Sequence, residues 1–312
     1  MRAVAVTDGG LPALRELPEP ALEPGGVLVR VRYCGLCGSD AEKLVPGGAA
    51  AGSVLGHELS GVVVAGALPA GTRVAVAHHV PCGACAACAS GHEPLCPSFG
   101  ASALVPGGFC ELTAASAAHV RHAVLPLPDA VSDLEATFVE PLACVLRGLA
   151  ALPADGAVLI LGAGTIGLLA GSALQAAGRE AIVADTDPAR AQAAAERGHR
   201  APLPGERFAG AFLTAPGALA AGIGSLAGGG TLVAFAGGRA QRLDLDAVYR
   251  RELTVVGVRS STPAYLRAAL ALLEAGAVDA EALIDCVLPL EDFADGLRRY
   301  RAREARKVVI SA

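Results

Sequence analysis

A cysteine and a histidine–glutamate pair near the N-terminus have residue types and a spacing suited to metal chemistry. Cys37 precedes the triplet Gly56-His57-Glu58 within one stretch of the sequence. Thiolate sulfur, imidazole nitrogen and carboxylate oxygen are ligands that Zn²⁺ accepts, and a catalytic zinc needs about three protein ligands and one open position. The pattern predicts a metal centre, although a histidine–glutamate pair in apolar surroundings fits a structural role equally well. Two further groups of residues decide between these interpretations.

A short run of four cysteines predicts a second metal site. The spacing is C-x2-C-x2-C-x7-C, in Cys82, Cys85, Cys88 and Cys96. Four thiolates in one loop match a closed tetrahedral zinc site. An iron–sulfur cluster is the alternative, but ferredoxins with this pattern have a shorter final gap. The start of the chain turns polar too early for a secretory signal peptide, which favours metal over disulfides. We expect the other cysteines to be small buried hydrophobic residues, namely Cys34, Cys110, Cys144 and Cys286.

A glycine-rich turn between an apolar run and a helical pattern predicts a dinucleotide site. Gly162, Gly164 and Gly167 form G-x-G-x-x-G directly after the apolar run, and Asp185 ends a second apolar run near the expected distance. The first glycine allows the tight turn, the second lets the backbone approach a pyrophosphate, and the third allows close helix packing. The uncharged segment 157–174 is long enough to mimic a membrane span, but its glycines favour a strand, a turn and a helix.

The spacing of apolar residues along the chain changes near residue 133. Before it, alternating apolar and polar residues predict a β-rich domain, and after it strands alternate with helices. Segments 209–215, 230–237 and 253–261 are each expected to be buried strands, followed by a helix over 263–275 and a last strand at 307–311. Only 200–208 separates the second crossover helix from the next strand, which is too short for another strand and a full helix. We therefore expect a parallel sheet that lacks its third strand.

Composition excludes some classes of partner. The chain has 312 residues and a net charge of −5, with no basic face for a nucleic acid. We expect a cytoplasmic protein of two domains that does not bind membranes.

Together these motifs resemble the zinc-dependent medium-chain alcohol dehydrogenases, most closely the branch of polyol, threonine and sugar dehydrogenases. The resemblance rests on Cys37-Gly38-Ser39-Asp40, Gly56-His57-Glu58, the four cysteines, Glu140-Pro141-Leu142 and the glycine turn, and it spans essentially the whole chain. It implies a GroES-like β-rich catalytic domain, 1–148 with 280–312 returning to it. It also implies a Rossmann coenzyme domain, 149–279, with a doubly wound parallel sheet. We expect a homodimer or homotetramer with two zinc ions per chain, NAD as coenzyme and a small alcohol or ketone as substrate.

The resemblance also assigns roles to residues. Cys37 and His57 would bind the catalytic zinc, and Glu58 and Glu140 compete for the carboxylate position. Cys82, Cys85, Cys88 and Cys96 would bind a structural zinc. Asp40 resembles the carboxylate that orients the histidine ligand. The dinucleotide would be bound by residues of the turn and the second strand, namely Gly162, Gly164, Thr165, Ile166, Gly167, Asp185 and Arg190.

Four further positions bear on the reaction or its substrate. Ser39 resembles the hydroxyl that begins a proton relay. Glu42 stands where many relatives place a relay histidine, and sugar dehydrogenases of the family also carry a glutamate there. Lys43 replaces an aromatic residue common in polyol enzymes, which argues against sorbitol-like specificity. Lys307 occupies the place of a cation near Glu58 and the coenzyme phosphates. Oxidation of an amino alcohol and reduction of a sugar or cyclitol ketone both stay open.

Simpler interpretations exist for one pair of histidines and for the chain as a whole. His78 and His79 precede the cysteine run, and we expect them to be partly exposed histidines at a strand end. The alternative to an active dehydrogenase is a catalytically silent relative that binds zinc and dinucleotide as a sensor. Such a relative would be expected to lose Cys37, His57, Ser39 or Asp40, and all four are present.

Overall fold

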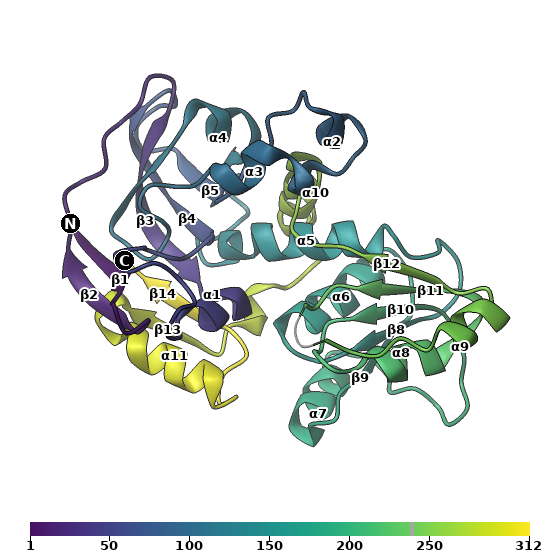
Figure 1. Cartoon of the computed structure of the whole chain (residues 1–312). Coiled ribbons are helices and arrows are strands. Elements are labelled where there is room, and N and C mark those ends of the chain that lie inside the picture. The colour runs from purple at the N-terminus through teal and green to yellow at the C-terminus, as the bar shows by residue number, and fades with distance from the viewer. Residues whose placement is uncertain (238–239) are drawn as a thin grey trace. The chain divides into compact units, whose positions relative to one another are not determined.

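The chain divides into two compact units (Figure 1). The computed structural model describes residues 1–237 and 240–312. Unit 1 comprises Met1–Pro141, Thr262–Glu274 and Ala280–Ala312, and unit 2 comprises Leu142–Ser261 and Ala275–Asp279. Among the described residues, no helix is long and apolar enough to cross a membrane.

Unit 1 is built on a mixed sheet whose strands come from both ends of the chain. Its order is β13-β14-β3-β4-β5-β7, and β6 pairs with β3. The strands are β3 (Val27–Gly35), β4 (Glu58–Gly66), β5 (Arg73–Ala77), β6 (Leu112–Ala115), β7 (Val124–Pro126), β13 (Cys286–Pro289) and β14 (Val308–Ser311). A separate hairpin pairs β1 (Arg2–Val6) with β2 (Pro12–Glu16). The alternating sequence of 1–32 is therefore antiparallel strand, as predicted.

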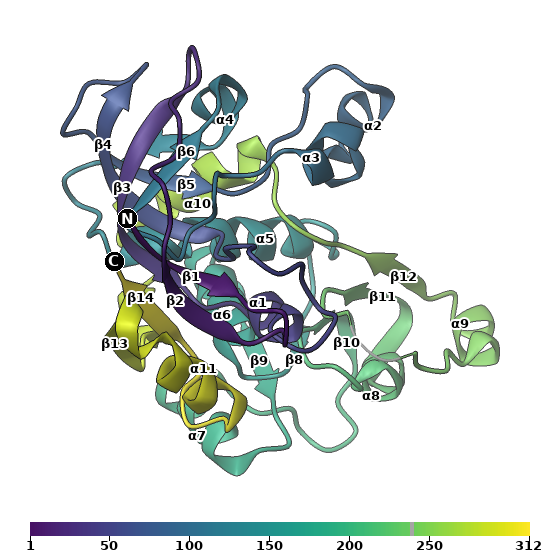
Figure 2. The ribbon, with the colours of Figure 1, turned by 60° about the vertical axis from the view of Figure 1, so that its left-hand side comes forward.

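Short helices fill the connections of unit 1. They are α1 (Gly38–Lys43), α2 (Ala86–Ala89), α3 (Pro97–Ala101), α4 (Ala117–His122), α10 (Pro263–Glu274), α11 (Phe293–Arg301) and the 3₁₀ turns η1 (Glu93–Leu95), η2 (Glu135–Phe138), η3 (Glu281–Leu283) and η4 (Leu290–Asp292). Helix α11 lies against β13 and β14 (Figure 2). Phe293 of α11 meets Phe109 edge to face in the core, with ring centroids 4.8 Å apart.

Unit 2 is a parallel five-stranded sheet with helices between its strands. The order is β12-β11-β10-β8-β9. The strands are β8 (Val158–Leu161), β9 (Ala181–Ala184), β10 (Phe208–Leu213), β11 (Leu226–Ala234) and β12 (Thr254–Gly257), and the helices are α6 (Thr165–Ala176), α7 (Pro188–Glu196), α8 (Leu219–Ser225) and α9 (Leu245–Arg250). Helix α5 (Val139–Leu149) contains the sequence boundary between the units. Because β8 has β9 on one side and β10 on the other, the chain order reverses beside the glycine turn, as in doubly wound sheets.

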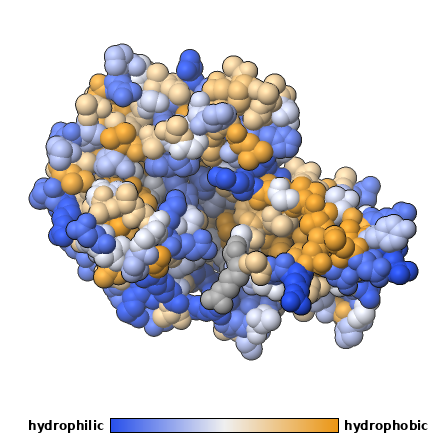
Figure 3. Space-filling model, viewed as in Figure 1, coloured by the Kyte–Doolittle hydropathy of each residue, from blue (hydrophilic) through white to orange (hydrophobic). Residues whose placement is uncertain are grey.

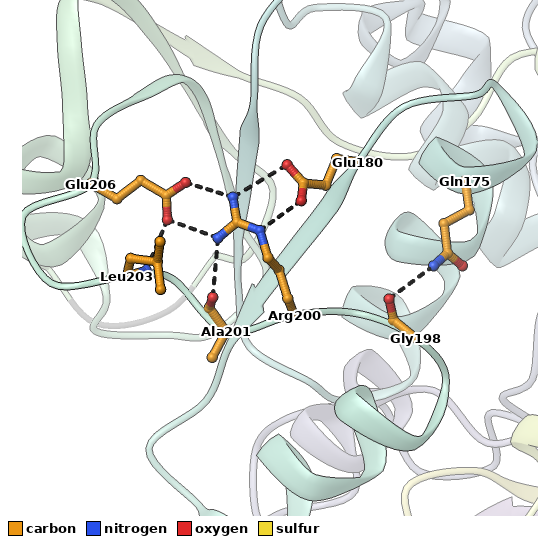
Figure 4. A network of polar contacts seen from close by, with 7 residues as sticks. All are labelled: Gln175, Glu180, Gly198, Arg200, Ala201, Leu203 and Glu206. Atoms are coloured by element: carbon orange, nitrogen blue, oxygen red, sulfur yellow. Dashed lines mark hydrogen bonds and ion pairs between the residues drawn. The ribbon is translucent and has the colours of Figure 1, made fainter.

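The predicted loss of the third strand is confirmed, and an arginine network stands in its place. On the side of β9 away from β8, the described residues form a single isolated parallel bridge, between Ile182 and Arg200, with the N–H of Val183 donating to the Arg200 carbonyl over 3.0 Å. The Arg200 side chain bonds the carboxylates of both Glu180 and Glu206 (Figure 4). Hydrogen bonding to Arg200 lowers the pKa of Glu206 to about 2. The network thus fastens the loop 200–207 to the open edge of the sheet.

Two sequence expectations differ from the structure. Segment 253–261 is not a buried strand, because β12 lies at the sheet edge with Thr254, Val255 and Gly257 exposed. The units also differ from the predicted domains, 1–148 with 280–312 and 149–279, in the place of α10. Leu266 of α10 lies beside Leu59 of β4 and Leu125 of β7, which groups this helix with unit 1.

A buried histidine in unit 2 predicts a loss of stability in acid. His199 is 2% exposed, its ring lies against Gly171 of α6, and both ring nitrogens lack hydrogen-bond partners among the described residues. Burial, helped by Arg197, lowers the pKa of His199 below its ordinary value of 6.5. As pH falls, His199 therefore takes up a proton in the unfolded chain at a higher pH than in the folded chain. The free energy of unfolding should fall as pH drops below 6.5. We expect His199→Phe to flatten this dependence in urea unfolding curves, and an equally steep loss in the variant would contradict it.

Candidate active site

Cys37 and Asp40 are held together by the start of α1. Strand β3 ends at Gly35, and Cys37 is the residue that precedes the helix. Its N–H donates to Oδ2 of Asp40 over 3.1 Å. Asp40 is only 1% exposed, and its other carboxylate oxygen, Oδ1, lies 3.4 Å from Nδ1 of His57. One buried carboxylate thus fixes the loop of Cys37 and the ring of His57 at the same time.

The charge of Asp40 also sets the electrostatics of His57. Burial by itself would lower the pKa of His57, but the Asp40 carboxylate and Cys37 raise it well above the ordinary value. Burial by itself would raise the pKa of Asp40. The opposing effects of His57 and the Cys37 N–H are stronger together, so the pKa of Asp40 lies below its ordinary value. An imidazole whose Nδ1 faces a carboxylate is oriented to offer Nε2 to a metal, which is the arrangement usual around histidine ligands.

Glu58 is paired with a buried lysine from the far end of the sequence. Lys307 is 2% exposed and donates from Nζ to Oε2 of Glu58. The ammonium also lies 5.1 Å from the ring centroid of Phe138. Burial lowers the pKa of Lys307, but Glu58 reverses this and raises it. Gly35 of β3 makes room for the pair, because a Cβ there would collide with both charged groups.

The structure brings three of the four predicted ligands of the first metal together. Ligand atoms of Cys37, His57 and Glu58 all lie within 4.8 Å of one another, and the donor set of sulfur, nitrogen and oxygen fits zinc. Glu140, in the first turn of α5, is not part of this cluster in the described chain.

The two predicted relay residues differ in their surroundings. Ser39 is partly buried, and its hydroxyl forms no hydrogen bond within the part of the chain that the structure describes, so it is free to meet a substrate. Glu42, three positions further along α1, is exposed to solvent.

The four cysteines of the second predicted site also converge. The Sγ atoms of Cys85 and Cys88 are 3.5 Å apart, and those of Cys82 and Cys88 are 3.9 Å apart. Four sulfurs that each lie about 2.3 Å from one tetrahedral zinc are separated by about 3.8 Å. Cys96 completes the group, and all four ligand atoms lie within 4.8 Å of one another. The spacing of the sulfurs therefore suits a closed zinc site.

Backbone N–H groups in the same loop favour the thiolate form of two of the four cysteines, whereas burial raises the pKa of Cys88 to about 12. The N–H of Cys82 points to Sγ of Cys96 over 3.3 Å, which lowers the pKa of Cys96 to about 6. The N–H of Ala84 points to Sγ of Cys82 over 3.4 Å and lowers its pKa as well. Thiolates are the form that binds metal.

The remaining cysteines form no disulfide among the described residues, and most of them are buried. Cys34, Cys110 and Cys144 are buried, as predicted. Cys286 is only partly buried, so that expectation is wrong for it; it begins β13, a strand at the sheet edge.

The glycine turn of unit 2 has the geometry that close contact with a phosphate requires. Gly162 has φ +112°, and a Cβ there would lie 2.6 Å from Oγ1 of Thr214. A Cβ on Gly167 would collide with the carbonyl of Gly162. Above Gly164, by contrast, the nearest atom to such a Cβ is Nη1 of Arg190, at 3.9 Å. The turn thus leaves open space beside a helix N-terminus and a guanidinium, which suits a pyrophosphate.

Asp185 stands directly after β9 and is bound to the same turn. Its Oδ2 accepts a hydrogen bond from the N–H of Ala163 over 2.8 Å, and Oδ1 accepts one from Asp187 over 2.9 Å. The carboxylate is partly buried and retains lone pairs for further donors. Thr165 and Ile166 form the first turn of α6, partly buried beside Gly164.

Comparison with known proteins shows the family of the chain. Residues 23–129 match the alcohol dehydrogenase GroES-like domain family. D-altritol 5-dehydrogenase of Agrobacterium fabrum is 34% identical over 322 residues, covering 94% of either chain. L-galactonate-5-dehydrogenase of Escherichia coli is 30% identical, covering 95% of this chain and 94% of the relative. Alcohol dehydrogenase TADH of Thermus sp. ATN1 superposes with a TM-score of 0.89 at 27% identity, over 100% of this chain and 99% of the other.

The chain belongs to the zinc-dependent medium-chain alcohol dehydrogenase family. It is therefore an oxidoreductase of alcohols, and its expected fold, a GroES-like domain with a Rossmann domain, is confirmed. The cofactors of this family are zinc and a nicotinamide dinucleotide.

Sequence reasoning missed two residues that support this dehydrogenase's sites. Gly35 leaves space for the Glu58–Lys307 pair, and Thr214 fixes the glycine turn by donating to the carbonyls of Leu161 and Gly162. Both come from parts of the sequence that contain no motif. The position of Gly35, two residues before Cys37, is the one signal that could have drawn attention to it.

Proposed function

We propose that this dehydrogenase transfers hydride reversibly from a secondary alcohol of the polyol, sugar, cyclitol or amino-alcohol class to NAD. The observation that supports it best is the cluster of Cys37, His57 and Glu58 beside the unbonded hydroxyl of Ser39. Polyhydroxylated substrates are favoured among these classes, because the two relatives named above are, by name, altritol and galactonate dehydrogenases.

In this proposal Cys37 and His57 hold a catalytic zinc, with Glu58 or Glu140 as the third ligand. When bound, zinc supplies a Lewis acid that lowers the pKa of the substrate hydroxyl. Asp40 keeps the His57 ring oriented through Nδ1. Ser39 accepts the hydroxyl proton at Oγ and passes its own proton outward toward Glu42. The glycine turn of unit 2 would hold the dinucleotide, which would supply the hydride acceptor.

Cys82, Cys85, Cys88 and Cys96 hold a second, structural zinc in the same proposal, which makes two ions per chain. Support comes from the separation of their sulfurs and from the N–H groups that point at two of them. A closed set of four thiolates leaves no open position for a substrate.

A panel assay tests the proposed reaction. Formation of NADH is followed with polyols, aldoses, cyclitols and amino alcohols, each at the same concentration. We expect rates well above background for at least one secondary alcohol. A zinc-replete protein that binds NAD and oxidises none of these substrates would contradict the proposal.

Asp185 should make the enzyme prefer NAD. Its carboxylate can accept hydrogen bonds from the ribose hydroxyls of the adenosine, whereas the 2′-phosphate of NADP would meet a like charge. Repulsion in a partly desolvated site is worth a few kcal/mol, or roughly 100-fold in specificity. We expect kcat/KM to favour NAD by at least that factor and Asp185→Ser to reduce it. Equal values for the two coenzymes in the wild type would overturn this role.

Glu42 should matter mainly at low pH. In the proposed relay the last proton acceptor is a carboxylate, whose ordinary pKa lies about two units below that of an imidazole. We expect Glu42→Gln to lower the oxidation rate most at low pH, where hydroxide is scarce, and to leave KM nearly unchanged. The measurement is the pH profile of kcat. A profile identical to the wild type's would show that Glu42 is only a solvated side chain.

We also propose that the chain forms a homodimer or homotetramer through the open edge of the unit 2 sheet. Strand β12 pairs only with β11 among the described residues, and Val255 is 39% exposed. Apolar side chains gather over this part of the molecule (Figure 3), and Leu245 of α9 is 70% exposed. An apolar strand edge of this kind is suited to pairing with a second copy. Sedimentation should show an oligomer that Val255→Lys weakens, and a monomeric wild type would contradict it.

Two further expectations stay proposals. We propose folding domains at 1–148 with 280–312 and at 149–279, which assign α10 by its place in the sequence to the second domain although its contacts group it with unit 1. We place the enzyme in the cytoplasm, on the ground that five of its cysteines lie in the two candidate metal clusters, where they must stay reduced.

A further inference from the structure

Helix α1 contains much of the proposed chemistry but is too short to be stable by itself. Cys37 precedes it, and Ser39, Asp40 and Glu42 lie within its six residues. Isolated helices of fewer than about 12 residues are marginal in water, because nucleation costs more free energy than so few hydrogen bonds recover. The carbonyls of the last turn also have no partner inside the helix. The position of α1 must therefore be fixed by other parts of unit 1.

Arg301 of α11 supplies partners at the C-terminal end of α1. Its Nη2 donates to the carbonyl oxygen of Ala41 over 2.9 Å and to that of Leu44 over 2.7 Å. One nitrogen of a guanidinium has two hydrogens, so it can form both bonds at once. The cation also lies at the negative end of the helix dipole, where positive charge is favourable. The side chain of Leu44 is buried in the core of the unit, so both the side chain and the carbonyl of this residue are held.

Tyr300, the neighbour of Arg301, contacts the other end of α1. A Cβ on Gly38, the first residue of the helix, would lie 3.0 Å from the hydroxyl oxygen of Tyr300. Two consecutive residues of α11 thus meet the first and the last turn of α1. Helix α11 is itself anchored, because Phe293 and Leu297 are buried in the core of the unit.

Arg301 differs from the neighbouring arginines of α11 in what it binds. Arg298 and Arg299 both form ion pairs with Asp295. Within the part of the chain that the structure describes, Arg301 forms no ion pair, and its hydrogen bonds go to the carbonyls at the end of α1. This guanidinium is therefore used to hold the backbone of α1.

We propose that Arg301 is a positioning residue of the active site, which holds α1 so that Ser39 and Asp40 stay in place beside the substrate and the metal. The inference rests on the proposed function, because the roles of these two residues belong to it. The N–H of Leu44 links Arg301 to them, since it donates to the carbonyl of Asp40 over 3.0 Å. Without Arg301 the last turn of α1 opens more readily, and this bond opens with it. A displacement of about 1 Å in an active site costs roughly 100-fold in rate.

Hydrogen exchange on the zinc-replete protein tests the contact without requiring activity. Arg301→Met removes the donors and keeps a long side chain, whereas Arg301→Lys keeps a cation. Arg298→Met lies on the same helix without a bond to α1 and is the matched control. In Arg301→Met we expect the amides of Ala41 and Leu44 to exchange about tenfold faster, which corresponds to about 1.4 kcal/mol less for local opening. Exchange in β14 should stay within about twofold, and Arg301→Lys should give an intermediate rate in α1.

Kinetics test the positioning itself, with zinc-replete enzyme, NAD and the best alcohol of the panel. Per folded molecule, we expect kcat of Arg301→Met to fall about tenfold and KM for the alcohol to stay within about twofold. The substrate still finds the metal in this variant, whereas the proton acceptor is misplaced. Arg301→Lys should recover part of kcat, because its ammonium can still donate to a carbonyl of α1. Arg298→Met should behave as the wild type.

The outcomes separate this inference from the proposed function. A wild type that oxidises no alcohol overturns the proposed function and the inference with it. An active wild type whose kcat is unchanged in Arg301→Met overturns the inference alone, and so does an unchanged rate of exchange in α1. Equal losses of kcat in Arg301→Met and Arg298→Met would also overturn it, because they would show a general effect of the charge on α11.

Discussion

Replacing Cys88 with serine should release one of two zinc ions per chain and lower the midpoint of thermal unfolding, on the order of 10 °C. The four-cysteine loop, Cys82–Cys96, contains only the short helix α2 and the turn η1, with Cys82 exposed. Such a loop has little apolar core, so metal binding must supply much of its folding free energy. In the proposed function the reaction takes place at the other metal site, so the remaining activity per folded molecule should be largely kept.

Metal analysis and calorimetry on the same preparations check this prediction. Cys286→Ser is the matched control, since this partly buried cysteine belongs to neither metal cluster. The control should keep both zinc ions and nearly the same thermal midpoint. Iron with visible absorbance in the wild type would refute the zinc assignment. An unchanged zinc content in Cys88→Ser would refute the ligand role of this residue.

Replacing Lys307 with methionine should destabilise the protein, and more strongly when zinc has been removed. The substitution leaves the carboxylate of Glu58 buried without its partner, and breaking a buried ion pair from one side costs about 3–5 kcal/mol. If Glu58 binds the catalytic zinc, the metal compensates part of that lost charge. Zinc should then recover a larger share of stability in Lys307→Met than in the wild type.

The same substitution at the exposed Lys43 is the control, and we expect it to change stability by no more than about 0.5 kcal/mol. Urea unfolding of the wild type and of Lys307→Met, each with and without zinc, gives the four free energies of unfolding that are compared. A loss in Lys307→Met that is independent of zinc would show that Glu58 is not a ligand, and would leave Glu140 as the carboxylate. No loss at all would contradict the structural role of the ion pair.

Much of the fold could be predicted because local patterns and spacing are strong in this chain. The glycine turn follows a buried strand and opens a helix, and Asp185 follows the next strand, so their proximity in unit 2 follows from the βαβ connection. The missing third strand was predictable from length alone, since 200–208 cannot contain a strand and a crossover helix. The cysteine loop was predictable because all its sulfurs lie within one short segment.

Features that depend on distant segments were harder to predict. The pairing of Glu58 with Lys307 joins residues 249 positions apart, and only the resemblance to a family indicated it. The exposure of β12 depends on its place at the sheet edge, which periodicity does not reveal. The hydrogen bonds from Arg301 to the end of α1 join residues 260 and 257 positions apart, and no local pattern predicts them.

Zinc-dependent formation of NADH is the most direct test of the proposed activity. The best substrate of the alcohol panel is assayed with the enzyme as purified, after removal of zinc by a chelator, and after zinc is restored. We predict that activity disappears with the metal, returns with zinc, and does not return in His57→Ala. Activity that persists without zinc, or that is the same in His57→Ala, would contradict a catalytic zinc site at Cys37 and His57.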